Sequence, residues 1–143
     1  MFDPDRNQVR QFYCSLLRKH RELQPLVGAE LAALPIVLAH PEYHALLEQP
    51  DTALERDYLP EHGETNPFLH LSLHLALSEQ LSIDQPTGVR AAFQRLLTRM
   101  GHDEHAAQHA MIDCLAEMIW QSQRNGGALS EAVYFACLDR QGA

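Results

Sequence analysis

The stretch Asn66-Pro-Phe-Leu-His-Leu-Ser-Leu-His-Leu-Ala-Leu77 determines how the rest of the chain is expected to fold. Asn66 is a residue type that caps helix N-termini, and Pro67 suits the first helical turn. Because Pro86 cannot continue a helix, the pattern predicts a helix from Pro67 to about residue 84. We call this the anchor helix.

Two histidines lie on one face of the anchor helix. His70 and His74 are four residues apart, which places their side chains one above the other. Leucines occupy the same face, so both imidazoles are expected to be buried among apolar side chains. A buried imidazole needs a polar partner, and the sequence should therefore supply one elsewhere. The leucines are Leu73, Leu77 and Leu81.

The other apolar segments also repeat with helical spacing, and none shows the period of two that is typical of strands. We predict an all-α, single-domain helical bundle of about six to seven helices over residues 1–143. Residues 50–66 show no period and contain two prolines and a glycine, so an irregular loop is expected there. The further predicted helices cover about residues 5–21, 25–39, 41–49, 87–100 and 103–124, with a last short helix after Ser130.

Composition narrows the classes of partner. The 143 residues carry a formal net charge of −8, which disfavours nucleic acid and anionic membranes as partners. A protein partner or a homo-oligomer is compatible with this charge. The start of the chain does not resemble a signal peptide, and the three scattered cysteines are interpreted as reduced thiols. A cytoplasmic location is therefore expected.

A second group of possible ligands follows Asp103. His105, His109, Asp113 and Glu117 are spaced by four, so they form one slowly winding stripe on a helix. The connections at Pro86 and Gly101 are short, which predicts that the anchor helix and this helix run parallel, with both histidine pairs at the same height.

The two HxxxH pairs suggest a metal site. We predict that His70, His74, His105 and His109 bind one transition metal ion, zinc or iron, with Asp113 or Glu117 assisting. No motif for an organic cofactor is present, and no catalytic residue is assigned.

The alternative is a non-catalytic adaptor or regulatory module, in which these histidines are core residues that form hydrogen bonds between helices. His40 and His44 form a third pair. His40 precedes Pro41 at the expected start of a short helix, so a structural capping role is favoured over metal ligation for this pair.

Several specific strings resemble one family of short proteobacterial proteins, the domain of unknown function family eighteen forty-one. The resemblance covers about residues 36–124 and implies no activity. Its strings are His40-Pro-Glu-Tyr-His44, Thr65-Asn-Pro-Phe-Leu-His70-x-x-x-His74, Gln80 through Pro86, Asp103-Glu-His105-x-x-x-His109, and Trp120-Gln-x-Gln-Arg124. Hemerythrin-like and ferritin-like bundles are similar only in a looser way, because their Glu-x-x-His helix motif is not matched.

Overall fold

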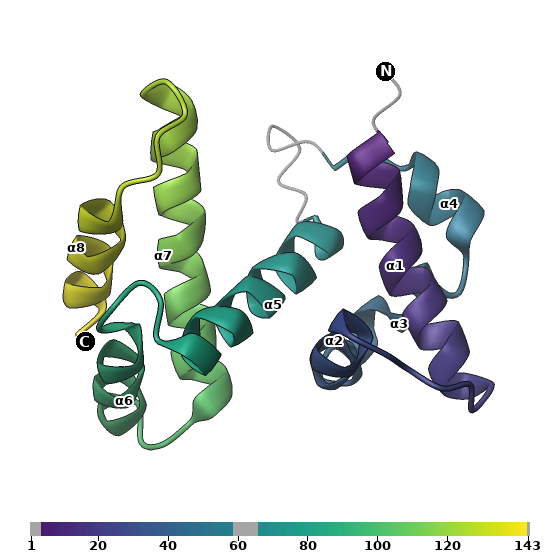
Figure 1. Ribbon diagram of the computed structural model, residues 1–143, viewed down its shortest axis with the longest axis horizontal. Coiled ribbons are helices and arrows are strands. Elements are labelled where there is room, and N and C mark those ends of the chain that lie inside the picture. The colour runs from purple at the N-terminus through teal and green to yellow at the C-terminus, as the bar shows by residue number, and fades with distance from the viewer. Residues whose placement is uncertain (1–3, 59–65, 143) are drawn as a thin grey trace. The chain divides into compact units, whose positions relative to one another are not determined.

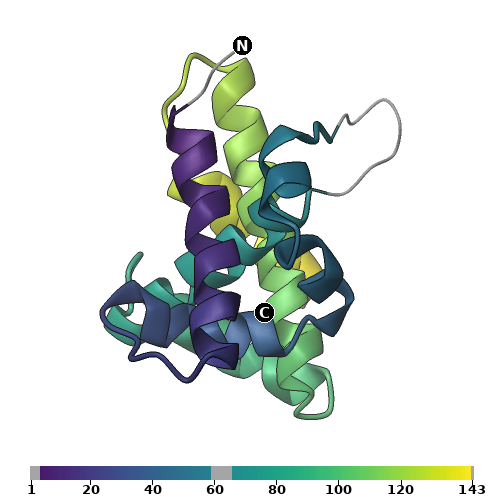
Figure 2. The same ribbon diagram turned by 90° about the vertical axis from the view of Figure 1, so that its right-hand side faces the viewer.

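The computed structural model describes residues 4–58 and 66–142. Over these residues the chain forms eight α-helices, one 3₁₀ helix and no strand (Figures 1 and 2), which confirms the all-α prediction. The elements are α1 (Pro4–Arg21), α2 (Ala29–Leu38), η1 (Pro41–Tyr43), α3 (His44–Leu47), α4 (Pro50–Glu55), α5 (Pro67–Ile83), α6 (Val89–Arg99), α7 (Glu104–Arg124) and α8 (Glu131–Gln141).

The chain divides into two compact units, Met1–Leu75 and Ala76–Ala143, called unit 1 and unit 2 below. The division falls inside α5, so the first turns of the anchor helix belong to unit 1 and its last turns to unit 2. The single domain over residues 1–143 stays a prediction.

In unit 1, α1 packs against α2, α3 and α4. The buried side chains of α1 recur at helical spacing, so they form one apolar stripe along the helix. This stripe faces the three helices. Burial of this apolar surface is the main stabilising term for the unit. The core residues are Tyr13, Cys14, Leu16, Leu17, Ala33, Val37, Leu47, Ala53, Phe68 and Leu71.

The helix boundaries follow the capping signals in the sequence. The Asn66 side chain accepts hydrogen bonds from the backbone N–H groups of Phe68 and Leu69 at the start of α5. Asp103 and Ser130 cap α7 and α8 in the same way. Each cap satisfies backbone donors that have no partner within the helix.

The expected irregular loop over 50–66 is wrong for its first part, because Pro50–Glu55 forms α4. Arg10 of α1 holds this short helix against α1. Its guanidinium donates to the carbonyl oxygens of Ala53 and Arg56, at 2.7 and 2.6 Å, and is 4% exposed. Residues 59–65 of the predicted loop lie outside the described residues.

Helix α2 differs from its expected orientation. The spacing of its leucines predicts that Leu31, Leu34 and Leu38 mark the buried side. Instead Ala33 and Val37 are buried, Leu31 and Leu38 are exposed, and only Leu34 of the three is partly buried against the core. The helix is apolar almost all round, so hydrophobic periodicity could not show which side packs on α1. The sequence predicts that Pro35 kinks or splits this helix; it does not split it, because α2 continues through Pro35.

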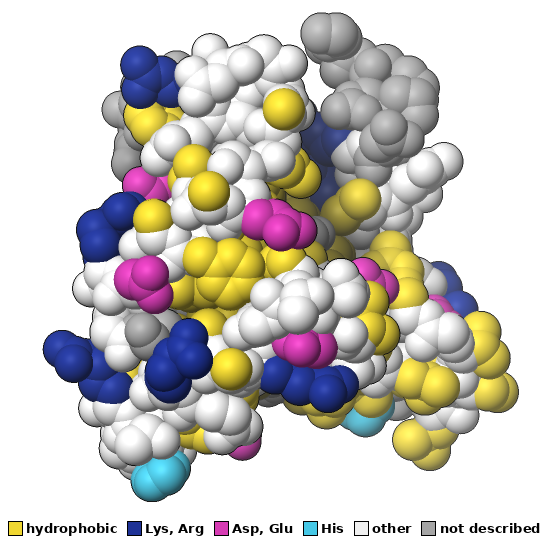
Figure 3. Space-filling view, turned by 60° about the vertical axis from the view of Figure 1, so that its left-hand side comes forward, with side chains coloured by type: hydrophobic (Ala, Val, Ile, Leu, Met, Phe, Trp, Pro, Cys, Tyr) yellow, Lys and Arg dark blue, Asp and Glu magenta, His cyan; other side chains and the backbone are white. Residues whose placement is uncertain are grey.

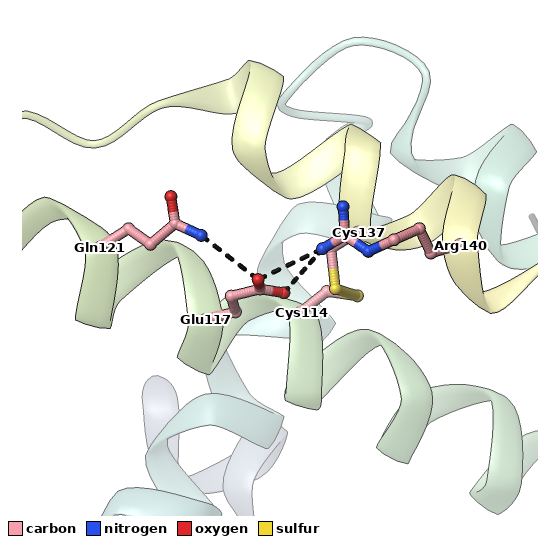
Figure 4. Close-up of polar contacts among 5 residues, drawn as sticks. All are labelled: Cys114, Glu117, Gln121, Cys137 and Arg140. Carbon is pink, nitrogen blue, oxygen red and sulfur yellow. Dashed lines mark hydrogen bonds and ion pairs between the residues drawn. A yellow bond between two sulfur atoms is a disulfide. The ribbon is translucent and has the colours of Figure 1, made fainter.

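Unit 2 is built on α7, which packs against α6 and α8. Cys114 of α7 and Cys137 of α8 form a disulfide, with Cα atoms 5.5 Å apart (Figure 4). The expectation of three reduced thiols is therefore wrong for this pair, and Cys14 alone is free. The two cysteines are 23 residues apart in sequence but adjacent once α8 folds back on α7.

Among the described residues, no helix combines the length and the apolar character needed to cross a membrane.

Candidate metal centre

Three histidines of unit 1 come together. His40 follows the end of α2, whereas His70 and His74 are on the first turns of α5. Each residue offers a ring nitrogen within 4.8 Å of a ring nitrogen of the other two. His40 and His74 are 2% and 4% exposed, and His70 is half-buried. We call these residues the histidine triad.

Local structure explains the convergence of the triad. His70 and His74 share a helix face because they are one turn apart, and their ring centroids lie 4.8 Å apart. Pro41 begins η1 directly after His40, so the chain turns sharply at this point. The His40 ring then lies 5.0 Å from the His70 ring and 4.7 Å from the His74 ring, centroid to centroid.

The orientation of the His40 ring is fixed by the end of α2. Its Nδ1 atom lies 2.9 Å from the carbonyl oxygen of Ile36. Because a carbonyl oxygen only accepts hydrogen bonds, Nδ1 must carry the hydrogen, and in a neutral ring Nε2 then carries the lone pair. A metal-binding imidazole has the same tautomer, with one nitrogen donating to an acceptor and the other presenting its lone pair to the ion.

The lone pair of His40 Nε2 points at a second imidazole nitrogen. The Nε2 atom of His70 lies 3.2 Å from it. Two nitrogens bound tetrahedrally at about 2.0–2.1 Å from one zinc ion lie about 3.3 Å apart. The separation therefore matches both a hydrogen bond through one shared proton and a pair of ligands to one ion.

The third histidine pair of the sequence divides into two roles. His40 holds the predicted N-cap position of η1, but its side chain makes no capping hydrogen bond there and binds the Ile36 carbonyl oxygen instead. His44 donates from Nε2 to the carbonyl oxygen of Val37 at 2.8 Å. The structural interpretation of His44 is thus supported by its partner.

Tyr43 borders the triad. Its ring is parallel to that of His40, with 5.5 Å between centroids, and edge-on to that of His70 at 6.1 Å. Burial, followed by the nearby charge of Glu42, raises the pKa of the Tyr43 phenol. The phenol therefore stays protonated at neutral pH.

The second predicted pair, His105 and His109, lies on α7 in unit 2. The two rings lie 4.0 Å apart between centroids; His105 is exposed and His109 half-buried. That this pair shares an ion with His70 and His74 stays a prediction. The two helices were expected to run parallel, but the part of α5 in unit 2 runs obliquely to α7 (Figure 1).

The two carboxylates predicted to assist differ in their surroundings. Asp113 is exposed on α7. The Glu117 carboxylate accepts hydrogen bonds from Arg140 of α8, at 3.1 and 3.2 Å, and from Gln121 at 3.2 Å (Figure 4). Glu117 thus helps to join α7 to α8, and its role as a ligand stays a prediction.

The fold and the triad together define a class: an all-α protein with clustered, partly buried histidines. The chain belongs to the family described as domain of unknown function DUF1841, whose family model matches residues 5–140. The resemblance found in the sequence is thereby confirmed. No curated protein and no solved structure matches the chain.

Proposed function

We propose that the protein binds a late first-row transition metal ion, zinc or iron, through His40, His70 and His74. The observation that carries the proposal is the 3.2 Å separation between Nε2 of His40 and Nε2 of His70, with His40 Nδ1 tied to a carbonyl oxygen. In the metal-free protein, one proton bridges the two nitrogens. A metal ion takes the lone pairs of both nitrogens once the His70 hydrogen has moved from Nε2 to Nδ1, the other neutral tautomer of that ring.

The type of donor supports the choice of metal. Imidazole nitrogen suits zinc, iron, copper and nickel, whereas magnesium and calcium prefer oxygen. Three protein ligands leave a position for water or substrate, and four close the coordination sphere. We keep His105 and His109 as proposed ligands of this ion, with Asp113 or Glu117 assisting. Either histidine would complete a four-coordinate zinc site, whereas both together with the triad require an ion of higher coordination number, such as iron.

Metal analysis of protein purified without a polyhistidine tag tests the proposal. Wild-type protein is expected to hold one equivalent of zinc or iron after dialysis, and His70→Ala much less. His70 is the best position to change because it is only half-buried, so its loss disturbs the core least. His20→Ala is the matched control, because His20 lies at the end of α1 outside the triad. Metal-free wild-type protein that also fails to bind added zinc would refute the proposal.

A second candidate function is that of an adaptor, and exposed apolar side chains favour it. Leu23, Val27 and Leu31 are 92%, 69% and 61% exposed within one short segment of unit 1. Exposed apolar surface of this kind is typical of protein interaction sites. Light scattering on size-exclusion eluate tests self-association. Oligomers lost in Leu23→Ser would support the adaptor, and monomers at all concentrations would count against homo-oligomerisation.

We also propose that neither nucleic acid nor a membrane is a partner. The net charge of −8 supports this, and in Figure 3 basic and acidic side chains are interspersed on the face shown. A cytoplasmic location is proposed as well. Disulfides are rare in that compartment, but Cys114 and Cys137 are 0% and 6% exposed, which shields the bond from thiol reductants.

A further inference from the structure

The face of the His40 ring is in contact with one aromatic side chain that the proposed metal site does not use as a ligand. Tyr43 lies three residues after His40, and its backbone N–H donates to the His40 carbonyl oxygen at 3.0 Å. In a 3₁₀ turn, side chains three residues apart eclipse each other. The turn of η1 therefore brings the Tyr43 ring over the His40 ring, with an interplanar angle of 2°.

Two contacts together fix the His40 imidazole. The hydrogen bond from Nδ1 to the Ile36 carbonyl oxygen at 2.9 Å fixes which edge of the ring points away from the triad. This bond alone leaves the ring free to tilt about its own axis. The parallel Tyr43 ring restricts that tilt, and its edge-on contact with His70 extends the restraint to a second ligand.

We propose that Tyr43 is a positioning residue for the metal centre, which holds the His40 ring in its ligating orientation before the ion arrives. This inference rests on the proposed metal binding by His40, His70 and His74. Preorganisation raises affinity because the ring loses less freedom when the ion binds. The ring of Tyr43 supplies the contact, so its hydroxyl group is not required.

Zinc affinity and the visible absorption spectrum of the cobalt(II) form test the proposal. Tyr43→Phe keeps the ring and should bind zinc like the wild type. Tyr43→Leu removes the ring and should bind zinc at least tenfold more weakly, the size of loss seen when a supporting contact of a metal ligand is removed. Its cobalt(II) bands should also shift or weaken, because the geometry at the ion is less well defined.

Leu47→Ala separates positioning from general stability. Leu47 is 2% exposed in the same core but does not belong to the triad, so this variant should unfold more easily while its folded form binds zinc like the wild type. Tyr43→Met serves as a second ring-free variant should Tyr43→Leu fail to fold. Wild-type affinity and an unchanged cobalt(II) spectrum in a ring-free variant would overturn the positioning role alone. Absence of binding in the wild type would overturn the metal site as well.

Discussion

Cys114 and Cys137 join α7 to α8 through a disulfide, with Cα atoms 5.5 Å apart. The cross-link closes a loop of about 23 residues, for which the loss of chain entropy in the unfolded state corresponds to about 3 kcal/mol. We expect Cys137→Ser to lower the free energy of unfolding by about that amount, measured by urea denaturation. In denaturant without reductant, the wild type should titrate a single thiol, that of Cys14. Three titratable thiols would contradict the bond.

Metal removal should affect stability through the triad. An ion that binds only the folded state raises the free energy of unfolding by mass action. Zinc should therefore raise the melting temperature of the wild type and leave that of His74→Ala unchanged. His20→Ala should respond like the wild type. An equal rise in His74→Ala would show that zinc stabilises the protein elsewhere.

The pH dependence of metal binding follows from competition at the imidazole nitrogens. Protons and the ion bind the same lone pairs, so affinity should fall as the pH is lowered from about 8 to about 5. A competition titration with a colorimetric chelator at several pH values measures this. Affinity that does not change over this range would point to ligands other than histidine.

The prediction that His105 and His109 of α7 also bind the ion can be tested with the variants His105→Ala and His109→Ala. If these residues are ligands, each substitution should reduce zinc affinity as His70→Ala does. Gln108→Ala, on the same helix, is the control. Unchanged affinity in both histidine variants would restrict the centre to unit 1.

Glu30 should make stability depend on acid pH. A hydrogen bond from Lys19 at 2.8 Å, and then one from the Val27 backbone N–H at 3.1 Å, lower the pKa of the Glu30 carboxyl. A carboxyl with a lowered pKa in the folded state stabilises the protein when ionised, and this contribution is lost as the pH falls through that pKa. Urea unfolding between about pH 7 and about pH 3 should thus show a steeper acid loss for wild type than for Glu30→Gln. Parallel curves would contradict this.

The helices could be predicted well from the sequence, because their signals are local. Asn66, Asp103 and Ser130 each cap the helix that they were expected to begin or precede. Helix α4 was missed because its anchor is distant: Arg10 binds the Ala53 carbonyl oxygen from 43 residues away. The disulfide was missed for the same reason, since no local pattern pairs Cys114 with Cys137.

The candidate site could be predicted only in part. The spacing of His70 and His74 identified one pair, because a helix places residues four apart together. His40 was assigned a capping role, since its position before Pro41 fits a cap equally well. What distinguishes the two roles is the Ile36 carbonyl oxygen, which binds the ring of His40. The string His40-Pro-Glu-Tyr-His44 contained the signal, but only the fold shows which histidine faces α5.

The end of α2 has a consequence for how the metal centre and the helix respond to one another. The carbonyl oxygen of Ile36 binds the imidazole of His40, and that of Val37, which also accepts the His40 backbone N–H at 3.1 Å, binds the imidazole of His44. Fraying of the last turn of α2 would release the His40 ring, so the closed turn and the ligating ring exist together. By linkage, an ion bound by the triad suppresses local opening of this turn. The more often the turn opens in the metal-free protein, the lower the measured affinity of the protein for the ion.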